Sequence, residues 1–449
     1  MPMPEIRVSS FTGMNNIKAK DNFWSNAEAR LAEPRLVVNA DVSFSGNIRK
    51  RSGETLFLTL AGAHSLWAGT SCMLVAAAGK LYRIEGKVLK EVTDISGPED
   101  TLSYEEVDDK VYISNPWWNI VYSPGTDTVT DWGIALPNGP VLVQAAGAMP
   151  VGTYHVTMTN MVNDDISGNG PITSIELTVE GGIQILNRPA GALVWVTDEN
   201  EGIFYLAGAV DMITSIPSVE PLPTFLCNPP PNMSHLCFAF GRMWGASGST
   251  VYYSEPFETS WFKSSQNKFE FDDEVTLIAR VSTGMFFGLR SKTIFMLGNE
   301  PEQMQEQAAG AGSIPGTLVY ANNLPELGDV LGTPEKGFVT VPVWRTSEGI
   351  VAGNVMGRLY NLTKHKLRMG VPERGASLYR SYEGLFQFLT SSKLSQGHSG
   401  TGAEDTDTTN AFKNSGIIPS DKARKETISK TGFTDEAICE VYRNGVLIP

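Results

Sequence analysis

A short phrase recurs along the chain and constrains its fold more than any other feature of the sequence. The phrase consists of a small turn residue, one or two spacers, and an apolar residue beside an aromatic one. An apolar strand precedes most copies, so each copy reads as two alternating strands joined by a tight turn, which is a β-hairpin. The copies lie at residues 79–82, 118–122, 249–253, 291–295 and 357–360.

The spacing of the copies predicts how the hairpins are combined. The interval from Tyr82 to Tyr122 is 40 residues, and that from Tyr253 to Phe295 is 42 residues. A period of about 40 to 45 residues with several strands per repeat is typical of the blades of a β-propeller. We therefore expect an all-β protein built on a propeller of about six blades. The repeated aromatic residues, with Tyr360 in the last copy, should occupy comparable strand positions in separate blades.

The repeat is interrupted once. Between Tyr122 and Tyr253 there are about three periods of sequence without the hairpin phrase. Alternating strands such as residues 151–159 replace it, with turn residues at regular intervals, and proline-rich stretches stand on both sides. Short strands spaced in this way predict an immunoglobulin- or fibronectin-like β-sandwich inserted between blades.

The domain organisation follows from these patterns and from composition. Residues 301–338 are rich in Glu and Gln and then in Gly and Pro, which predicts a long loop. Residues from 391 to about 414 have few large apolar side chains, which predicts a flexible segment. The expected order is an N-terminal arm and strand pair at 1–55, a first propeller part at 56–139, the β-sandwich at 140–222, a second propeller part at 223–390, and a flexible segment with C-terminal strands at 391–449.

The charge balance bears on possible partners. The 449-residue chain has a formal net charge of −14 and should not bind nucleic acid in bulk. Its four cysteines form no CxxC pair, so neither a disulfide framework nor a zinc site is indicated. No signal peptide and no apolar run near the ~18 residues of a membrane helix is found. These features predict a soluble protein without membrane insertion.

The residue patterns of common enzymes are missing from the sequence. The five histidines do not have metal-ligand spacing, and neither a nucleophile elbow nor a phosphate-binding loop is present. We therefore predict that the chain is not an enzyme and has no catalytic residue, cofactor or metal ligand. Trp117 and Trp118 offer a possible sugar-stacking platform, although blade packing explains two adjacent aromatic residues more simply.

A basic cluster near the N-terminus is the one candidate interaction site. The first 53 residues carry eight Lys and Arg against five Asp and Glu, and Arg49, Lys50 and Arg51 are adjacent. Such a cluster either forms an interface or protects the edge of a strand from aggregation. We take Arg49, Lys50 and Arg51 as interface candidates that should meet an acidic neighbour.

Three phrases in order resemble a known family. Residues 39–53, NADV followed by GNIRKRSG, resemble the NVDV and GRIRRRPG phrase of tail nozzle proteins of short-tailed phages. These are also described as tail tubular protein B-like or packaged-DNA stabilisation proteins. Residues 242–262, RMWG followed by VYYSEPF and WF, are similar to a blade phrase of that family, and residues 152–154 with 203–206 are similar to its fibronectin-type insert. Ala40 and Ser52 depart from the usual Val and Pro.

The resemblance implies a specific role. It implies a structural virion protein of a podovirus tail, made in the host cytoplasm and forming a ring, expected to be a homohexamer, below the portal and adaptor proteins. The ring would lie near tail fibres or spikes and enclose the DNA channel, so that it retains the packaged genome and conducts it during genome ejection without binding it specifically. Two other readings stay open: a carbohydrate-binding propeller, lectin-like or a receptor-binding tail component, and a propeller scaffold of a cellular complex.

Overall fold

The computed structural model describes most of the chain as β-strand. It covers residues 10–11, 14–18, 24–26, 31–34, 37, 40–42, 47–50, 56–98, 100–215, 219–321, 340–382, 385–393, 437–443 and 446–448. Within these ranges there is no α-helix, and one 3-10 turn, η1, spans Pro301–Gln303. The chain divides into two compact units, residues 56–278 and residues 1–55 with 279–449. The predicted all-β class is confirmed.

The unit of residues 56–278 contains three four-stranded sheets in which each strand pairs antiparallel with the next one along the chain. Such meanders are propeller blades. The first is β6 (His64–Ala68), β7 (Met73–Ala77), β8 (Lys80–Glu85) and β9 (Val88–Asp94). The second is β10 (Ser103–Val107), β11 (Lys110–Asn115), β12 (Trp118–Ser123) and β13 (Thr128–Asp131). The third is β23 (Ser234–Ala239), β24 (Arg242–Ser247), β25 (Thr250–Tyr253) and β26 (Lys268–Glu270).

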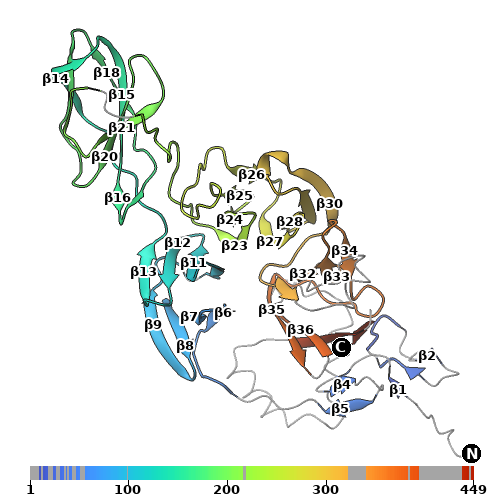
Figure 1. Cartoon of the computed structure of the whole chain (residues 1–449). Coiled ribbons are helices and arrows are strands. Elements are labelled where there is room, and N and C mark those ends of the chain that lie inside the picture. The colour runs from blue at the N-terminus through green and yellow to red at the C-terminus, as the bar shows by residue number, and fades with distance from the viewer. Residues whose placement is uncertain are drawn as a thin grey trace, which may run out of the picture. The chain divides into compact units, whose positions relative to one another are not determined.

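Three further sheets with the same strand order follow (Figure 1). Strand β27 (Val275–Val281) crosses the boundary between the units and precedes β28 (Gly284–Leu289), β29 (Lys292–Leu297) and β30 (Gln305–Ala311). The next sheet is β31 (Val319–Ala321), β32 (Val341–Thr346), β33 (Gly349–Gly353) and β34 (Leu359–Asn361). The last is β35 (Arg374–Tyr382), β36 (Leu385–Lys393), β37 (Ala437–Arg443) and β38 (Val446–Ile448). The described residues thus form six blades, as the repeat predicted.

Tight turns with positive φ angles join several of these strands. Ala78 and Gly79 have φ angles of 50° and 73° between β7 and β8, and Phe240 and Gly241 have 52° and 70° between β23 and β24. Two consecutive residues with positive φ form the type I′ turn, whose twist matches that of the strands it connects. In the copy of the phrase at residues 79–82, the type I′ turn explains why glycine occupies position 79.

The hydrophobic core of the unit 56–278 lies between its blades. Leu74 and Leu81 of the first blade pack with Val111, Ile113 and Tyr122 of the second. The opposite face of the second blade contributes Tyr112 and Val121 to a cluster with Met243 and Phe262 of the third. Strand β11 is consequently buried on both faces, and the alternation of exposed and buried residues expected for the hairpin strands is wrong there.

Hydrogen bonds link the first strands of neighbouring blades. In each, a backbone N–H of one blade donates to a serine hydroxyl of the preceding blade. Ser65 Oγ accepts a hydrogen bond from the Leu102 N–H just before β10 at 2.9 Å, and Ser103 Oγ accepts one from the Leu236 N–H of β23 at 2.7 Å. Ser65 and His235 have φ angles of 53° and 56° and lie where the pairing of β6 with β7 and of β23 with β24 shifts register. These bulges turn the first strand locally and mark equivalent positions in the two blades.

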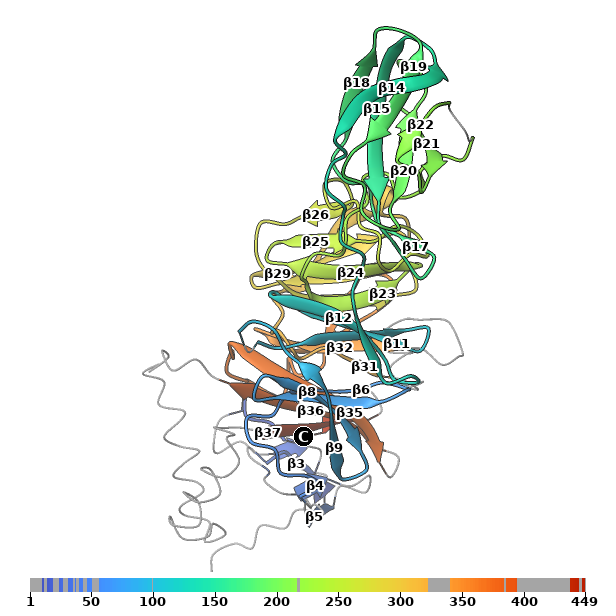
Figure 2. The ribbon, with the colours of Figure 1, turned by 90° about the vertical axis from the view of Figure 1, so that its left-hand side faces the viewer.

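The inserted domain is a β-sandwich, as predicted (Figure 2). One sheet has the order β14 (Leu142–Met149), β19 (Gly181–Ile185) and β22 (Met212–Ile213). The other has the order β18 (Thr173–Leu177), β15 (Gly152–Thr159), β20 (Leu193–Thr197) and β21 (Phe204–Gly208), and a hairpin of β16 (Met161–Val162) and β17 (Asp165–Ile166) extends from it. Tyr154, Val156, Ile183 and Val194 are fully buried in the core between the sheets.

The N-terminal arm contributes short strands to the other unit. These are β1 (Ser10–Phe11), β2 (Trp24–Asn26), β3 (Leu31–Ala32), β4 (Ala40–Val42) and β5 (Ile48–Lys50). Met14 belongs to the core of the β31–β34 blade. Glu33 is buried and forms ion pairs with Lys18 at 2.6 Å and Lys366 at 3.2 Å, which ties the arm to that unit.

Two expectations need correction. Tyr82, Tyr122, Tyr253 and Phe295 lie on the third strands of their sheets, but Tyr360 lies on the fourth strand, β34. The turn at residues 347–348 joins β32 to β33, so the phrase at 350–352 is itself a third strand. The long loop expected at 301–338 contains η1, β30 and β31, because an exposed outer strand needs no large apolar residues. Residues 322–339 and 394–436 lie outside the described residues.

Candidate functional site

Arg49 and Lys50, two of the three predicted interface residues, belong to the β4–β5 hairpin. Lys50 is opposite Ala40 and Arg49 is opposite Asp41 in the register of the two strands. Ile48 and Lys50 are exposed, which is the placement that an interface requires. The side chain of Arg49 and the whole of Arg51 lie outside the described residues.

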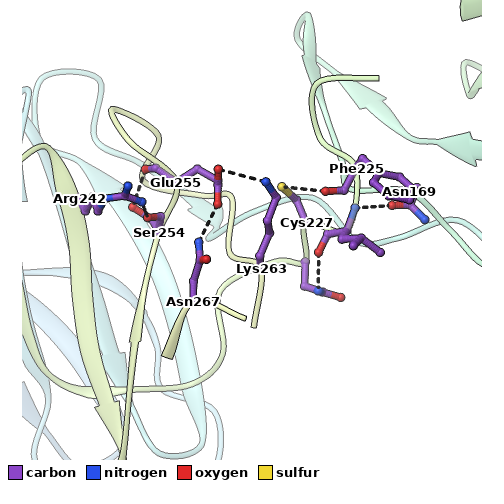
Figure 3. Close-up of polar contacts among 10 residues, drawn as sticks. Asn169, Phe225, Cys227, Arg242, Ser254, Glu255, Lys263 and Asn267 are labelled. Carbon is purple, nitrogen blue, oxygen red and sulfur yellow. Dashed lines mark hydrogen bonds and ion pairs between the residues drawn. The ribbon is translucent and has the colours of Figure 1, made fainter. Parts of the chain in front are cut away.

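A second candidate site is a polar network that includes residues of the 242–262 phrase (Figure 3). It is built on the segment between β25 and β26, residues 254–267. Glu255 is at its centre: one carboxylate oxygen accepts a hydrogen bond from Asn267 Nδ2 at 2.6 Å, and the other pairs with Lys263 Nζ at 3.2 Å. Asn267 is 9% exposed, whereas the side chains of Glu255 and Lys263 are 24% and 27% exposed.

Strand β24 anchors the start of this segment. Arg242 donates a hydrogen bond to the Ser254 carbonyl at 2.8 Å, and its guanidinium lies over the Tyr253 ring at 5.6 Å from the centroid. Ser254 Oγ accepts the Met243 N–H at 2.9 Å and donates to the Glu255 carbonyl at 3.1 Å. Because Ser254 is fully buried, its hydroxyl cannot form hydrogen bonds with water, and these two bonds take their place.

The same segment holds the chain that returns from the sandwich. Phe262 and Asn228 exchange both backbone hydrogen bonds, at 2.7 and 3.1 Å. Two residues earlier, the Leu226 N–H donates to Asn169 Oδ1 of the sandwich at 2.7 Å (Figure 3). Thr224 Oγ1 adds a bond to the Ser167 carbonyl at 2.7 Å. The network therefore joins the blade β23–β26 to the inserted domain, and we call residues 254–267 with 224–228 the joint.

Close packing reinforces the joint. A Cβ atom on Gly168 would lie 1.6 Å from the Cys227 carbonyl oxygen, so only glycine fits at this position. Phe225 packs on Phe204 with ring centroids 5.5 Å apart, and Leu222 is buried beside Trp195. The packing of the inserted domain therefore extends to Phe225, three residues beyond the end predicted at 222.

The electrostatics of the joint fit a structural role. Burial raises the pKa of the Cys227 thiol to about 11, although the Lys263 charge opposes this, so the thiol stays protonated near neutral pH. Burial also raises the pKa of Glu258, and the negative charge of Asp165 on β17 raises it further. Near the bulge of β23, burial lowers the pKa of His235 to about 4, with Glu274 opposing the change.

The described ranges contain no group of three or more His, Cys, Asp or Glu side chains arranged to hold a metal ion. The same ranges contain no helix long and apolar enough to cross a membrane. The segment 254–267 thus offers an ion pair and an amide on a shared carboxylate, an arrangement that can fix two segments together.

Sequence reasoning found part of the joint and missed part. Ser254, Glu255 and Phe262 belong to the phrase that carries the resemblance, which the sequence analysis assigns to a blade and not to a connection with the sandwich. Lys263, Asn267 and Asn169 were missed altogether. The available signal was the pair of polar residues at 263 and 267, four apart in a turn between strands. Their shared partner, Glu255, is defined only by the fold of the segment.

Comparison with known proteins adds little beyond the propeller architecture. No family model and no curated protein matches the chain. Among solved structures, it is similar to BBS1N in complex with ARL6DN, with 10% identity and a TM-score of 0.30 over 74% of this chain and 90% of that one. It is also similar to Saccharomyces cerevisiae Sqt1, with 10% identity and a TM-score of 0.27 over 71% and 76%, and to Kluyveromyces lactis Hsv2, with 8% identity and a TM-score of 0.27 over 72% and 86%. At these scores the strand topology, and not the likeness, defines the fold.

Proposed function

We propose that the chain is a structural virion protein, a tail nozzle subunit of a short-tailed phage. In this role it forms a ring below the portal and adaptor proteins, encloses the DNA channel, retains the packaged genome and conducts it on ejection. The observation that carries the proposal is the place of the 242–262 phrase. The residues that resemble the nozzle family form the joint between a blade and an inserted sandwich, which is the domain combination that the resemblance implies.

The charge of the chain supports a channel that DNA passes without adhering. Non-specific binding to DNA depends on Lys and Arg that neutralise phosphates. Each lost contact reduces the slope of log K against log salt concentration by about 0.9. The net charge of −14 disfavours such contacts. The cluster of Arg49, Lys50 and Arg51 offers about three contacts, too few for stable binding. We therefore assign the cluster to a protein interface, where complementary charge sets register.

The test is made on virions. Mass spectrometry of purified particles should detect the chain, and particles made without it should lose their packaged DNA. The isolated protein should not bind duplex DNA at ~0.15 M salt. Charge reversal at Arg49 and Arg51 should impair particle assembly while the monomer stays folded. Absence of the chain from virions, or sub-micromolar binding to duplex DNA, would refute the proposal.

A second candidate function rests on one exposed aromatic residue. Trp117 is 58% exposed in the turn between β11 and β12, whereas Trp118 packs against the core of the first two blades. An exposed indole can stack on a sugar ring, as in a lectin-like or receptor-binding tail component. A glycan array would test this function: binding that Trp117→Ala abolishes would favour it, and no binding would exclude the indole as a sugar platform.

A further inference from the structure

Strand β30 is an outer strand with an unprotected edge. It is the last strand of its sheet and pairs only with β29 among the described residues. Gln305, Glu306, Gln307 and Ala308 are all exposed, so no residue that the structure describes buries this half of the strand. Outer strands present unpaired N–H and C=O groups, which proteins usually protect with short strands, lysine or proline.

The other blades show this protection. The outer strands β13, β26, β34 and β38 have only three or four residues. Strand β9 has seven residues, as β30 does, but it carries Lys90, which forms an ion pair with Asp127, and it contacts β13 of the next blade. Strand β30 has seven residues with no Lys, Arg or Pro. Its bulge lies at Ala309, between the pairs Ile294–Ala308 and Thr293–Gly310, so the regular edge of residues 305–308 is the least protected of the described blades.

The charge around β30 defines what would add to it. Residues 300–307 include three glutamates and no basic residue. Glu302 and Glu306 are exposed, one just before the strand and one within it. An extended segment that pairs with this edge would therefore be favoured if it carried positive charge, because opposite charges across a ladder stabilise the pairing.

The same chain presents such a segment on β5. The β4–β5 hairpin is a two-stranded sheet, so β5 also has an outer side without a strand partner among the described residues. Its sequence is Ile48-Arg49-Lys50, and Ile48 and Lys50 are exposed. Two different, complementary surfaces on one chain produce a head-to-tail contact between copies, which closes into a ring when the rotation permits.

We propose that β5 of one copy adds to the outer edge of β30 of a second copy, with Lys50 near Glu306 or Glu302. The added strand extends the sheet of the blade across the subunit boundary, and backbone hydrogen bonds supply affinity while the charges set the register. The contact rests on the proposed ring, and it identifies the acidic neighbour of the basic cluster.

The first test is chemical cross-linking of the full-length protein with a carbodiimide, which joins a lysine to a carboxylate in direct contact. A mixture of isotope-labelled and unlabelled chains distinguishes contacts between copies from contacts within one. We expect a cross-link between Lys50 and Glu306 or Glu302 that combines labelled and unlabelled peptides, and its loss in Lys50→Arg. Failure to form it in the assembled protein overturns the proposal.

The second test is a charge exchange followed by sedimentation. Changing to lysine whichever glutamate forms the cross-link, Glu302 or Glu306, should weaken association by about tenfold. Lys50→Glu combined with that change should restore association, as expected for opposite charges exchanged across a ladder. Glu176→Lys, at an exposed position of strand β18, makes the same change elsewhere and should have no effect. If the wild type assembles and Glu302→Lys and Glu306→Lys each assemble equally well, the β5–β30 contact is wrong and the ring is unaffected.

A monomeric wild type leads to a third measurement. If the isolated chain does not assemble, the cross-link is sought in intact virions, where the portal and adaptor can direct assembly. If virions contain the chain but the Lys50 cross-link is not formed, the β5–β30 contact alone is overturned. If virions do not contain the chain, the proposed function is overturned, whether or not the isolated protein assembles.

Discussion

Removal of the Glu255 carboxylate should destabilise the unit of residues 56–278 and loosen the joint. Glu255→Ala deprives the nearly buried Asn267 of its acceptor at 2.6 Å, and a hydrogen bond to a charged group contributes about 1.5 to 3 kcal/mol. The partly exposed pair with Lys263 adds about 0 to 1 kcal/mol, because solvent screens it. We expect the free energy of unfolding to fall by about 2 to 3 kcal/mol.

The assay is differential scanning calorimetry of the full-length protein. For a unit of this size, 1 kcal/mol shifts the midpoint of unfolding by about 2 to 4 °C, so the variant should unfold about 4 to 12 °C lower. Lys263→Met should lower the free energy of unfolding by about 1 kcal/mol or less, since it leaves the Asn267 bond intact.

The matched control lies in the same blade. Glu270→Ala removes another lysine-paired glutamate, at 2.6 Å from Lys268, but one that is exposed and has no buried amide partner. Its unfolding midpoint should stay within about 2 °C of the wild type. If Glu255→Ala and Glu270→Ala behave alike, or if Lys263→Met is the more severe change, the account of the joint is wrong.

Three further outcomes are expected. The pKa of His235 is about 4 in the folded protein and near 6.5 in the unfolded chain, so the free energy of unfolding should be full above pH 6.5 and decline as the pH falls toward 4. In chemical unfolding, His235→Asn should show a smaller decline, and an unchanged pH profile would contradict this. Gly168→Ala should lower the free energy of unfolding by about 2 kcal/mol or more, because its Cβ would overlap the Cys227 carbonyl, whereas Gly125→Ala, which meets open space, should be neutral in the same thermal melts. A fragment of residues 140–228 should unfold cooperatively at a higher temperature than one of residues 140–222, because it retains Phe225 and the bonds of Thr224 and Leu226; equal midpoints by circular dichroism would show that these contacts do not stabilise the sandwich.

The sequence predicts the blades well because their signal is local. A two-residue turn and the strands on either side of it lie within a dozen residues, as at Ala78 and Gly79, and the repeat multiplies that signal. The prediction was wrong for Tyr360, where the hairpin phrase occupies the third and fourth strands and not the second and third. Periodicity alone does not distinguish these registers, since both place apolar residues between blades.

Contacts between distant segments could not be predicted in the same way. The outer strand β30 has the composition of a loop, because an exposed strand gains stability from its backbone ladder with β29 and needs no buried side chains. The sequence indicates the joint only as a phrase, since the fold brings Asn267 and Lys263 to Glu255 and brings Leu226 to Asn169 of the sandwich. The pairing of two strands in a hairpin can be predicted from the residues of that hairpin. The sharing of the Glu255 carboxylate by Lys263 and Asn267 depends on the conformation of the whole segment between β25 and β26.

The position of the inserted domain has a consequence for how such a chain can diverge. The sandwich is inserted within residues 132–233, the connection from the outer strand β13 to the first strand β23 of the next blade, whereas the connection between the first two blades spans only residues 95–102. Closing a connection more than tenfold longer adds only about 2 kcal/mol of chain entropy, because that entropy grows with the logarithm of length. Each blade is complete before this crossing begins, so a lineage can gain, lose or exchange a whole domain there while the ladders on either side are left intact.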